Sequence, residues 1–311
     1  MHQKSIEEAK KRLFSGELVI FPTETVYGIG GNANNHKSIE LIYKTKNRPI
    51  NNPLICHFAN IREIEKNFVL KDKDYELANT FWPGPLTLIL EKNKQSLISP
   101  LLSNNKNHVG CRIPNNEISL SLLSILDFPI AAPSANIATR TSITSIKDLD
   151  NKLKEIFYID GGSSVLGLES TVVQTTKNGC KILRLGSLTI EDIKIKFPKY
   201  EISIEQSNVS PGNQLKHYSP IKPIRINVDF VKKNEALLNF GINELTSDIK
   251  SLNLSIEENL SDASYNFYNY LNILDSINCS GIAVAPIPDQ GLGKTINDRL
   301  RRASYKDEQN I

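Results

Sequence analysis

The sequence lacks the cysteine pattern of a zinc-binding or disulfide-stabilised protein. Its four cysteines, Cys56, Cys111, Cys180 and Cys279, are scattered along the chain and form no C-x-x-C pair. A zinc knuckle needs paired ligands, and a disulfide framework is typical of short, cysteine-dense secreted chains. We therefore expect four reduced cysteines, as in a cytoplasmic protein.

Long apolar segments are also missing. The N-terminal residues contain no apolar core of the length found in a signal peptide. No stretch approaches the ~18 consecutive apolar residues that a membrane span requires. The sequence thus predicts a cytoplasmic protein with no membrane partner.

An excess of charge of either sign is absent as well. The chain has 37 lysines and arginines against 34 aspartates and glutamates, a formal net charge of +3. A general nucleic-acid binder usually carries a larger basic excess, or a basic arm, to neutralise phosphates. The balance favours an ordinary enzyme surface, within which a local basic pocket can still exist.

What the sequence contains is a mixture of helix and strand patterns. Of its 311 residues, 40% are hydrophobic, which is typical of a globular protein with substantial cores. Helices are predicted at residues 5–14, where Ser5 and Glu8 resemble a capping box, and at 38–44, 75–82, 190–197, 262–277 and 296–304. Strands are predicted at residues 18–21, 53–58, 86–90, 109–113, 130–132, 157–160, 170–174, 181–185, 224–228, 237–243 and 281–285.

A chain of this length is expected to form about two domains. Residues 208–220 are rich in turn formers and almost free of apolar periodicity, so they predict a connecting segment. We therefore predict an α/β domain over residues 1–205, a linker over 206–222 and a small α/β domain over 223–311.

The first candidate site is the segment from Phe21 to Gly28. Pro22 ends a strand there, and Thr23, Glu24 and Thr25 follow on a loop, where hydroxyls and a carboxylate can contact a small polar ligand. No G-x-x-x-x-G-K-[ST] or convincing G-x-G-x-x-G motif follows the strand, so phosphates must be held in another way.

Three cationic residues and His57 follow within residues 44–57. Lys44, Lys46 and Arg48 lie within five residues at a predicted helix end, where cations are weakly favoured in any case. Two prolines stiffen the next loop and would fix the position of Arg48. Further along, Arg112 stands in a short apolar strand, where burial requires an anionic partner such as a ligand carboxylate.

Three further motifs complete the set. Residues 82–87 form a proline-rich corner whose expected role is architectural. The apolar segment 129–133 leads to Ser134 and Asn136, which would lie on one face if the strand continued. No G-x-S-x-G elbow surrounds Ser134, so hydrogen bonding to a ligand is favoured over covalent catalysis. A glycine-rich loop at 161–167 leads into a hydroxyl-bearing strand, and Arg184 stands in a nearby strand.

Together these motifs resemble the YrdC-type threonylcarbamoyl-AMP synthase family. The segments PTETVYG, KNRP followed by NPL and His57, WPGPLT, GCRIP, APSAN, GLESTVV and LRLG stand in that family's order within residues 15–190. The later segments SPGNQLKHYSP and GLGKTINDRLRRAS resemble the long, two-domain form of the family. One departure follows Asn136, where Ile137-Ala138-Thr139 replaces the usual Ser-Gly pair.

The resemblance implies a fold and an activity. The fold would be a YrdC-like twisted mixed sheet with helices and a concave cleft, followed by a smaller Rossmann-like α/β domain. The activity would be that of a nucleotidyltransferase that joins L-threonine, bicarbonate and ATP, with Mg²⁺, into threonylcarbamoyl-AMP, pyrophosphate and water. Downstream partner proteins would transfer the threonylcarbamoyl group to adenosine 37 of tRNAs that read ANN codons, with direct tRNA binding by this chain weak or absent.

The resemblance also implies site residues, matched motif by motif. The threonine site would comprise Thr25, His57, Arg112, the backbone of Ala132, and Ser170. The ATP site would comprise Arg48, Asn52, His108, Ser134, Asn136, Ser142, Arg184 and Tyr218. Lys46 and Arg48, at the family's Lys-x-Arg, would be catalytic. The linker that carries Tyr218 would serve as a lid, and no protein side chain is expected to bind the metal.

The sequence argues against two other functions. A module that binds double-stranded RNA or tRNA would need a basic surface or stacking aromatics that the sequence does not offer. A carbamoyl-transfer enzyme of hydrogenase maturation would need an acylphosphatase-like segment and zinc-finger cysteines, which this sequence does not contain. The small second domain is expected to be a regulatory or partner-docking unit.

Overall fold

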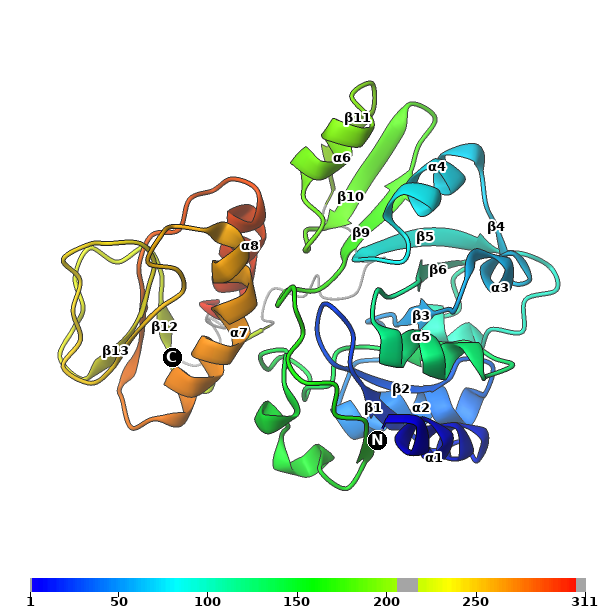
Figure 1. Ribbon diagram of the computed structural model, residues 1–311, viewed down its shortest axis with the longest axis horizontal. Helices are drawn as coiled ribbons and strands as arrows, with labels where there is room; N and C mark the ends of the chain where they lie inside the picture. The colour runs from blue at the N-terminus through cyan, green and yellow to red at the C-terminus, as the bar shows by residue number, and fades with distance from the viewer. Residues whose placement is uncertain (1, 206–217, 306–311) are drawn as a thin grey trace.

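The computed structural model describes residues 2–205 and 218–305, and its strands form two separate sheets. Figure 1 shows a large lobe that contains the N-terminus and a smaller lobe built from the C-terminal residues. The larger sheet is mixed, and its strands follow the order β11-β10-β9-β5-β6-β3-β7-β2-β1-β8, with β4 paired to β5. The four strands of the smaller sheet are all parallel, in the order β12-β15-β13-β14.

The bounds of the elements in the large lobe are as follows. Its strands are β1 Val19–Phe21, β2 Gly28–Asn32, β3 Ile55–His57, β4 Phe68–Val69, β5 Leu86–Lys92, β6 His108–Arg112, β7 Ile130–Ala132, β8 Phe157–Tyr158, β9 Thr171–Thr175, β10 Gly179–Arg184 and β11 Glu201–Ile204. Its helices are α1 His2–Phe14, α2 His36–Lys46, α3 Ile61–Glu65, α4 Asp72–Phe81, α5 Glu117–Ser124 and α6 Ile190–Lys196, with short 3₁₀ turns at Pro100–Ser103, Ile146–Asp148 and Asn151–Leu153.

The small lobe has fewer elements. Its strands are β12 Ile224–Arg225, β13 Glu235–Asn239, β14 Ser251–Asn253 and β15 Gly281–Val284, and its helices are α7 Leu260–Ser276 and α8 Leu292–Ala303. In Figure 1 these two helices lie between the small sheet and the large lobe. Val26 and Leu168 of the large lobe belong to the same apolar cluster as Phe267 and Leu271 of α7, so the two lobes share part of their core.

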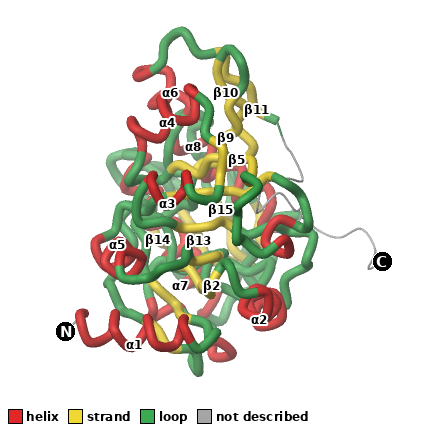
Figure 2. The backbone as a smooth tube through the Cα atoms, turned by 90° about the vertical axis from the view of Figure 1, so that its right-hand side faces the viewer, coloured by secondary structure: helices red, strands yellow, loops and turns green. Residues whose placement is uncertain are grey.

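Alternation along the strands assigns the two faces of the large sheet. Val19, Phe21 and Ile130 pack with α1 and α5, whereas Ile20 and Ile29 pack with α2 and α4. Figure 2 shows α1 and α5 on one side of β2 and α2 on the other. Successive strand residues point to opposite faces, so a short apolar strand can supply both cores.

Strand register then positions two candidate site residues. His57 is the partner of Arg112 on β6 and of Ile130 on β7, so all three side chains point to the face that α1 and α5 cover in part. His57 also contacts the ring of Phe21 edge-on, with 5.9 Å between the ring centroids. The uncovered part of this face is where the candidate site lies.

The mixed sheet, the helices around it and the second α/β unit confirm the predicted fold class. The sequence patterns did not predict α3, α5, β2, β4, β11 and β14. They were also wrong about the start of α1, which begins at His2, so that Ser5 and Glu8 lie inside the helix and Glu8 pairs with Arg12 at 2.9 Å. The predicted linker lies mostly at 206–217, outside the described residues, and the domain bounds stay a prediction.

The missed strand β2 has a physical explanation. Glycine is depleted in strands, so the sequence Gly28-Ile-Gly-Gly-Asn32 gives little strand signal. Here a side chain would not fit: a Cβ at Gly30 would lie 2.8 Å from Cε1 of Phe21 and closer still to Ile130. The glycine therefore permits close packing of the strand against its neighbours.

We predict that Gly30→Ala lowers the free energy of unfolding by about 1–3 kcal/mol, the usual cost of overpacking a core. Urea denaturation measures the change as a lower urea concentration at the unfolding midpoint, with an unchanged dependence of the unfolding free energy on urea. Gly28→Ala is the matched control on the same strand, because its added Cβ would meet its nearest neighbour at 3.2 Å and should cost less. Equal midpoints for wild type and Gly30→Ala would contradict the packing argument.

Candidate active site

A cleft opens on the partly covered face of the large sheet. It has about 550 Å³ of empty space, open solvent at its mouth included. Nine of the residues predicted from the sequence line it: Thr25, Arg48, His57, Arg112, Ala132, Ser134, Ser170, Arg184 and Tyr218. They come from strands β3, β6, β7 and β10, from the β1–β2 and α2–β3 loops, and from the loop after β7. Ser170 directly precedes β9, and Tyr218 begins the second described part of the chain.

At one end of the cleft, Arg112 is buried beside a carboxylate. Its Nη2 lies 2.7 Å from Oε1 of Glu24, and the side chains of both residues are only 4% exposed. Arg112 Nη1 also donates to the hydroxyl of Thr25 at 2.9 Å, and that hydroxyl lies 2.8 Å from the hydroxyl of Thr23. The buried cation therefore has the anionic partner that its burial requires. The sequence placed Glu24 on the loop but did not include it in the site.

His57 lies beside this pair as a neutral imidazole. Burial first, and then the nearby charge of Arg112, lowers the pKa of His57 to about 3. Its Nδ1 is buried and has no hydrogen-bond partner among the described residues. A buried polar atom without a partner is costly, so a ligand hydroxyl or amine at this nitrogen would compensate it.

Arg48 projects into the cleft from a stiff loop. Its Nε donates to the carbonyl of Asn52 at 3.0 Å, and its Nη2 donates to the side chain of Asn52 and to the carbonyl of Pro53 at 2.9 Å. Burial lowers the pKa of Arg48 to about 10, which leaves the guanidinium charged at neutral pH. Asn52 is not among the cleft-lining residues and instead holds Arg48 in place.

Lys46 is buried behind the cleft wall, because it ends α2 beneath the Ser134 loop. Its ammonium donates to the carbonyl of Ser134 at 2.6 Å and to the carbonyl of Asn136. Burial, and then the charge of Arg48, lowers the pKa of Lys46 well below its ordinary value. The hydroxyl of Ser134 donates to the side chain of Asn136, which in turn donates to the carbonyl of Arg140 at 2.7 Å. Lys46 and Asn136 thus fix the loop that presents Ser134.

Arg184 and Ser170 meet on the neighbouring strands. Arg184 Nη2 donates to the carbonyl of Ser170 at 2.6 Å and to its hydroxyl at 3.1 Å. The same hydroxyl lies 2.8 Å from that of Thr87 on β5. These contacts hold a cation and a hydroxyl side by side in the cleft wall.

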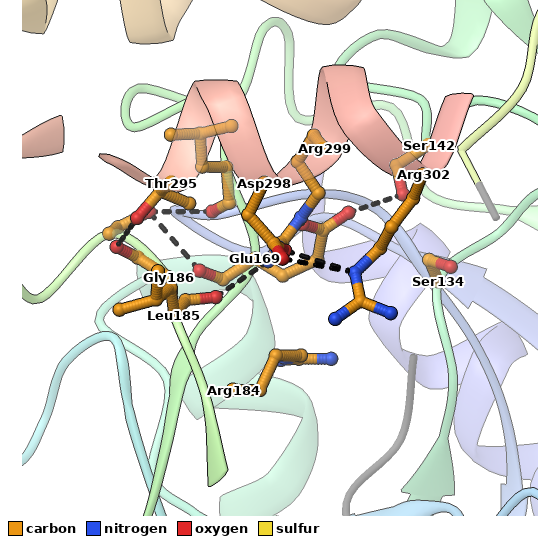
Figure 3. Close-up of polar contacts among 12 residues, drawn as sticks. Ser134, Ser142, Glu169, Arg184, Leu185, Gly186, Thr295, Asp298, Arg299 and Arg302 are labelled. Carbon is orange, nitrogen blue, oxygen red and sulfur yellow. Dashed lines mark hydrogen bonds and ion pairs between the residues drawn. The ribbon is translucent and has the colours of Figure 1, made fainter. Parts of the chain in front are cut away.

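Glu169 is a second buried carboxylate of the wall, and it was not predicted. It accepts hydrogen bonds from Ser142 at 2.6 Å and from Arg299 of α8 at 2.9 Å (Figure 3). It also accepts a hydrogen bond from Tyr268 of α7 at 2.8 Å. Burial would raise the pKa of Glu169, but the charges of Arg299 and Arg184 outweigh this and hold the pKa below its ordinary value. The small lobe therefore contacts the cleft wall through Glu169.

Not every predicted residue reaches the cleft. Ser142 lies behind the wall, where it contacts Glu169. His108 starts β6, whereas Arg112 ends that strand, and His108 does not line the cleft. The structure does not bring His108 together with the other residues. Tyr218 does line the cleft, and its neighbour Ser219 donates its backbone N–H to Thr139 at 2.8 Å.

The described residues offer no ready protein site for a metal. They contain no group of three or more histidine, cysteine, aspartate or glutamate side chains close enough to share an ion. Glu169, the carboxylate in the cleft wall, is already engaged by Arg299 and two hydroxyls.

Two family models match the chain. The model of Sua5, YciO and YrdC, described as telomere recombination, matches residues 11–186, and the model described as the C-terminal domain of threonylcarbamoyl-AMP synthase matches residues 188–304. Threonylcarbamoyl-AMP synthase of Pyrococcus abyssi is 32% identical over 335 residues, with 97% of this chain and 96% of the relative covered. The enzyme of that name from Bacillus subtilis is 32% identical, with 96% and 92% covered.

Solved structures agree with these relatives. The crystal structure of P. abyssi Sua5 complexed with L-threonine matches with a TM-score of 0.85 at 30% identity, and the match covers 98% of this chain and 95% of that one. Full-length HypF matches with a TM-score of 0.53 at 18% identity, over 58% of this chain and 29% of HypF. The second likeness concerns the fold alone.

The pKa of His57 predicts a pH dependence of stability. Below about pH 6.5 the unfolded chain takes up a proton on His57 that the folded chain does not bind, so acidification favours unfolding. His57 should therefore contribute a loss of up to ~1.4 kcal/mol per pH unit as the pH falls towards 3. Urea denaturation at pH 6.5, 5.5 and 4.5 measures this slope.

Two variants isolate the effect. His57→Gln should show a shallower loss of stability between pH 6.5 and 4.5, because the titrating group is gone. His36→Gln, at a histidine whose side chain is 59% exposed, should keep the wild-type slope. A wild-type slope in His57→Gln would rule out a buried neutral imidazole.

Proposed function

Because this chain belongs to the Sua5/YciO/YrdC family, we propose that it is a threonylcarbamoyl-AMP synthase that joins L-threonine, bicarbonate and ATP. The observation that carries the proposal is the composition of one cleft. Its lining brings Arg112, His57 and several hydroxyl groups together with Arg48 and Arg184. Such a cleft can seat an amino acid next to a nucleoside triphosphate.

The threonine seat would be built around Arg112. A planar guanidinium suits a carboxylate, and Glu24 and Thr25 fix the orientation of its fork. The hydroxyls of Thr25 and Ser170 and the backbone of Ala132 offer further polar contacts, and neutral His57 offers its unpartnered nitrogen.

The triphosphate would lie along the other part of the cleft. Arg48 and Arg184 are buried cations suited to phosphate oxygens, Ser134 adds a hydroxyl, and Tyr218 adds an aromatic wall. Lys46 supports this part through the Ser134 loop, so we assign it a positioning role in place of direct catalysis. Asn52, Asn136 and Ser142 would act in the same indirect way, and the role of His108 in nucleotide binding stays a prediction.

The chemistry needs no protein nucleophile. The threonine amine attacks the carbon of bicarbonate, with loss of water, or the carbon of CO₂, with loss of a proton. An oxygen of the resulting N-carboxylate then attacks the α-phosphorus of ATP. The bond from that phosphorus to the pyrophosphate oxygen breaks. The protein's share is to align the reactants and to stabilise charge through Arg48 and Arg184, in a nucleotidyltransferase reaction. Mg²⁺, carried on the ATP phosphates, would neutralise charge on the triphosphate.

The product would then pass to other proteins. Threonylcarbamoyl-AMP is a mixed anhydride, which hydrolyses readily in water, so a closed site would protect it. Tyr218 lines the cleft and would cover the nucleotide, whereas the predicted lid residues 206–217 lie outside the described residues. A tRNA threonylcarbamoyl transfer machinery in the cytoplasm is the proposed consumer. No helix of the described residues has the length and apolar character needed to cross a bilayer.

We predict that Arg48→Ala abolishes the pyrophosphate release that threonine, bicarbonate and ATP support together, because the buried cation that the α2–β3 loop places in the cleft is lost. A coupled pyrophosphate assay measures it, with each substrate omitted in turn. Arg62→Ala, at an exposed arginine, should retain wild-type release. Wild-type turnover in Arg48→Ala would remove Arg48 from the site.

A further inference from the structure

Arg299 is the most deeply buried cation of the small lobe. It lies on α8, and its side chain has no exposed area. A guanidinium is rarely hidden to this degree unless anions and carbonyls surround it. The contacts of Arg299 therefore indicate why its side chain is buried.

The contacts of Arg299 cross from one lobe to the other. Its Nε donates to Glu169 at 2.9 Å and its Nη2 donates to the carbonyl of Leu185 at 2.6 Å, both in the large lobe (Figure 3). Its guanidinium carbon lies 4.6 Å from the centroid of the Tyr218 ring. One side chain of the small lobe thus contacts three segments that enclose the cleft.

Each of these three segments carries a residue of the proposed nucleotide site or of its wall. Glu169 and Tyr218 line the cleft themselves, and Leu185 directly follows Arg184. Arg184 also holds Ser170, the residue after Glu169. A shift of Arg299 would therefore move several groups of the cleft together.

Arg299 is itself held by its own helix. Asp298 accepts from Arg299 Nη1 at 2.6 Å and from Arg302 Nε at 3.1 Å, which forms a row of alternating charges (Figure 3). Thr295, one turn earlier on α8, donates to the carbonyl of Gly186 at 3.0 Å. These contacts fix α8 against the end of strand β10, where Arg184 lies.

We propose that Arg299 is a positioning residue for ATP binding, and that the small lobe completes the nucleotide part of the cleft through it. The inference rests on the proposed function of the cleft. It assigns to the small lobe a structural part in the reaction itself, where the sequence predicted only a regulatory or docking unit. Threonine binding, which would depend on Arg112 and His57, should be affected less.

The test uses the full-length chain and the variants Arg299→Met and Arg299→Lys. Pyrophosphate release is measured while ATP and threonine are varied separately. We expect Arg299→Met to lower kcat/KM for ATP by about 10- to 100-fold, the range expected for small misplacements of binding groups, with a smaller change in the dissociation constant of threonine. Arg299→Lys should recover part of the loss, because an ammonium can still contact Glu169.

A double variant separates an effect of Arg299 on the geometry of the cleft from an effect on the stability of the fold. Arg299→Met leaves Glu169 without its principal cation, so the thermal midpoint should drop, and the double variant Arg299→Met/Glu169→Gln should recover much of it. If Arg299 also positions Leu185 and Tyr218, kcat/KM for ATP stays low in the double variant although the midpoint has recovered. If Arg299→Met does not fold, Arg299→Lys and the double variant carry the test.

Arg301→Met is the matched control, because Arg301 lies on the same helix and is exposed. It should behave as wild type. The inference is overturned if Arg299→Met and Arg301→Met give the same ATP kinetics, or if the double variant recovers stability and ATP use together. A wild-type chain that releases no pyrophosphate from the three substrates overturns the proposed function instead, and the inference with it.

Discussion

The buried ion pair between Glu169 and Arg299 is the contact on which the arrangement of the cleft depends. A carboxylate at this depth is tolerated only with a full set of partners, and Glu169 has a guanidinium and two hydroxyls. Since one partner comes from the loop after Ser134 and two come from the small lobe, satisfying this one charge requires both lobes to dock. The cleft wall and the domain arrangement are therefore one structural unit.

A nearly neutral chain can still hold a strongly cationic site. The net charge of +3 says nothing about the clustering of Arg48, Arg112 and Arg184 around one cleft. Arg112 has a carboxylate beside it, while Arg48 donates to the carbonyl and amide oxygens of Asn52. The positive charge of Arg112 is therefore partly neutralised within the protein, whereas within the described residues that of Arg48 is not. This difference suits a site that must bind one carboxylate near Arg112 and a triphosphate near Arg48.

Much of the fold and part of the site could be predicted from local patterns. Short apolar runs in the sequence located most strands. The order of the motifs assigned Thr25, His57 and Arg112 to one site, and the structure brings these three residues together in one cleft. Glu169 and Arg299 were missed because they are 130 residues apart, and no local pattern predicts a contact that forms only when two lobes dock. The strand β2 was missed because its glycines serve packing and give no strand signal.

The same physics separates residues that touch the cleft from residues that hold it. Lys46 stands in the same short motif as Arg48, yet its ammonium donates hydrogen bonds to two backbone carbonyls behind the cleft wall. Sequence alone could not distinguish the two roles, because both residues are cations two positions apart. Only the course of the chain around Ser134 decides which of them faces the ligand.

The central claim is that one cleft joins carbon from bicarbonate to threonine and to the adenylate of ATP. The most direct measurement is mass spectrometry of the nucleotide product formed from ¹³C-labelled bicarbonate, threonine and ATP. The account predicts one adenylate that carries a threonylcarbamoyl group with a single ¹³C. Formation of ADP, or of AMP that never carries label or threonine, would contradict it.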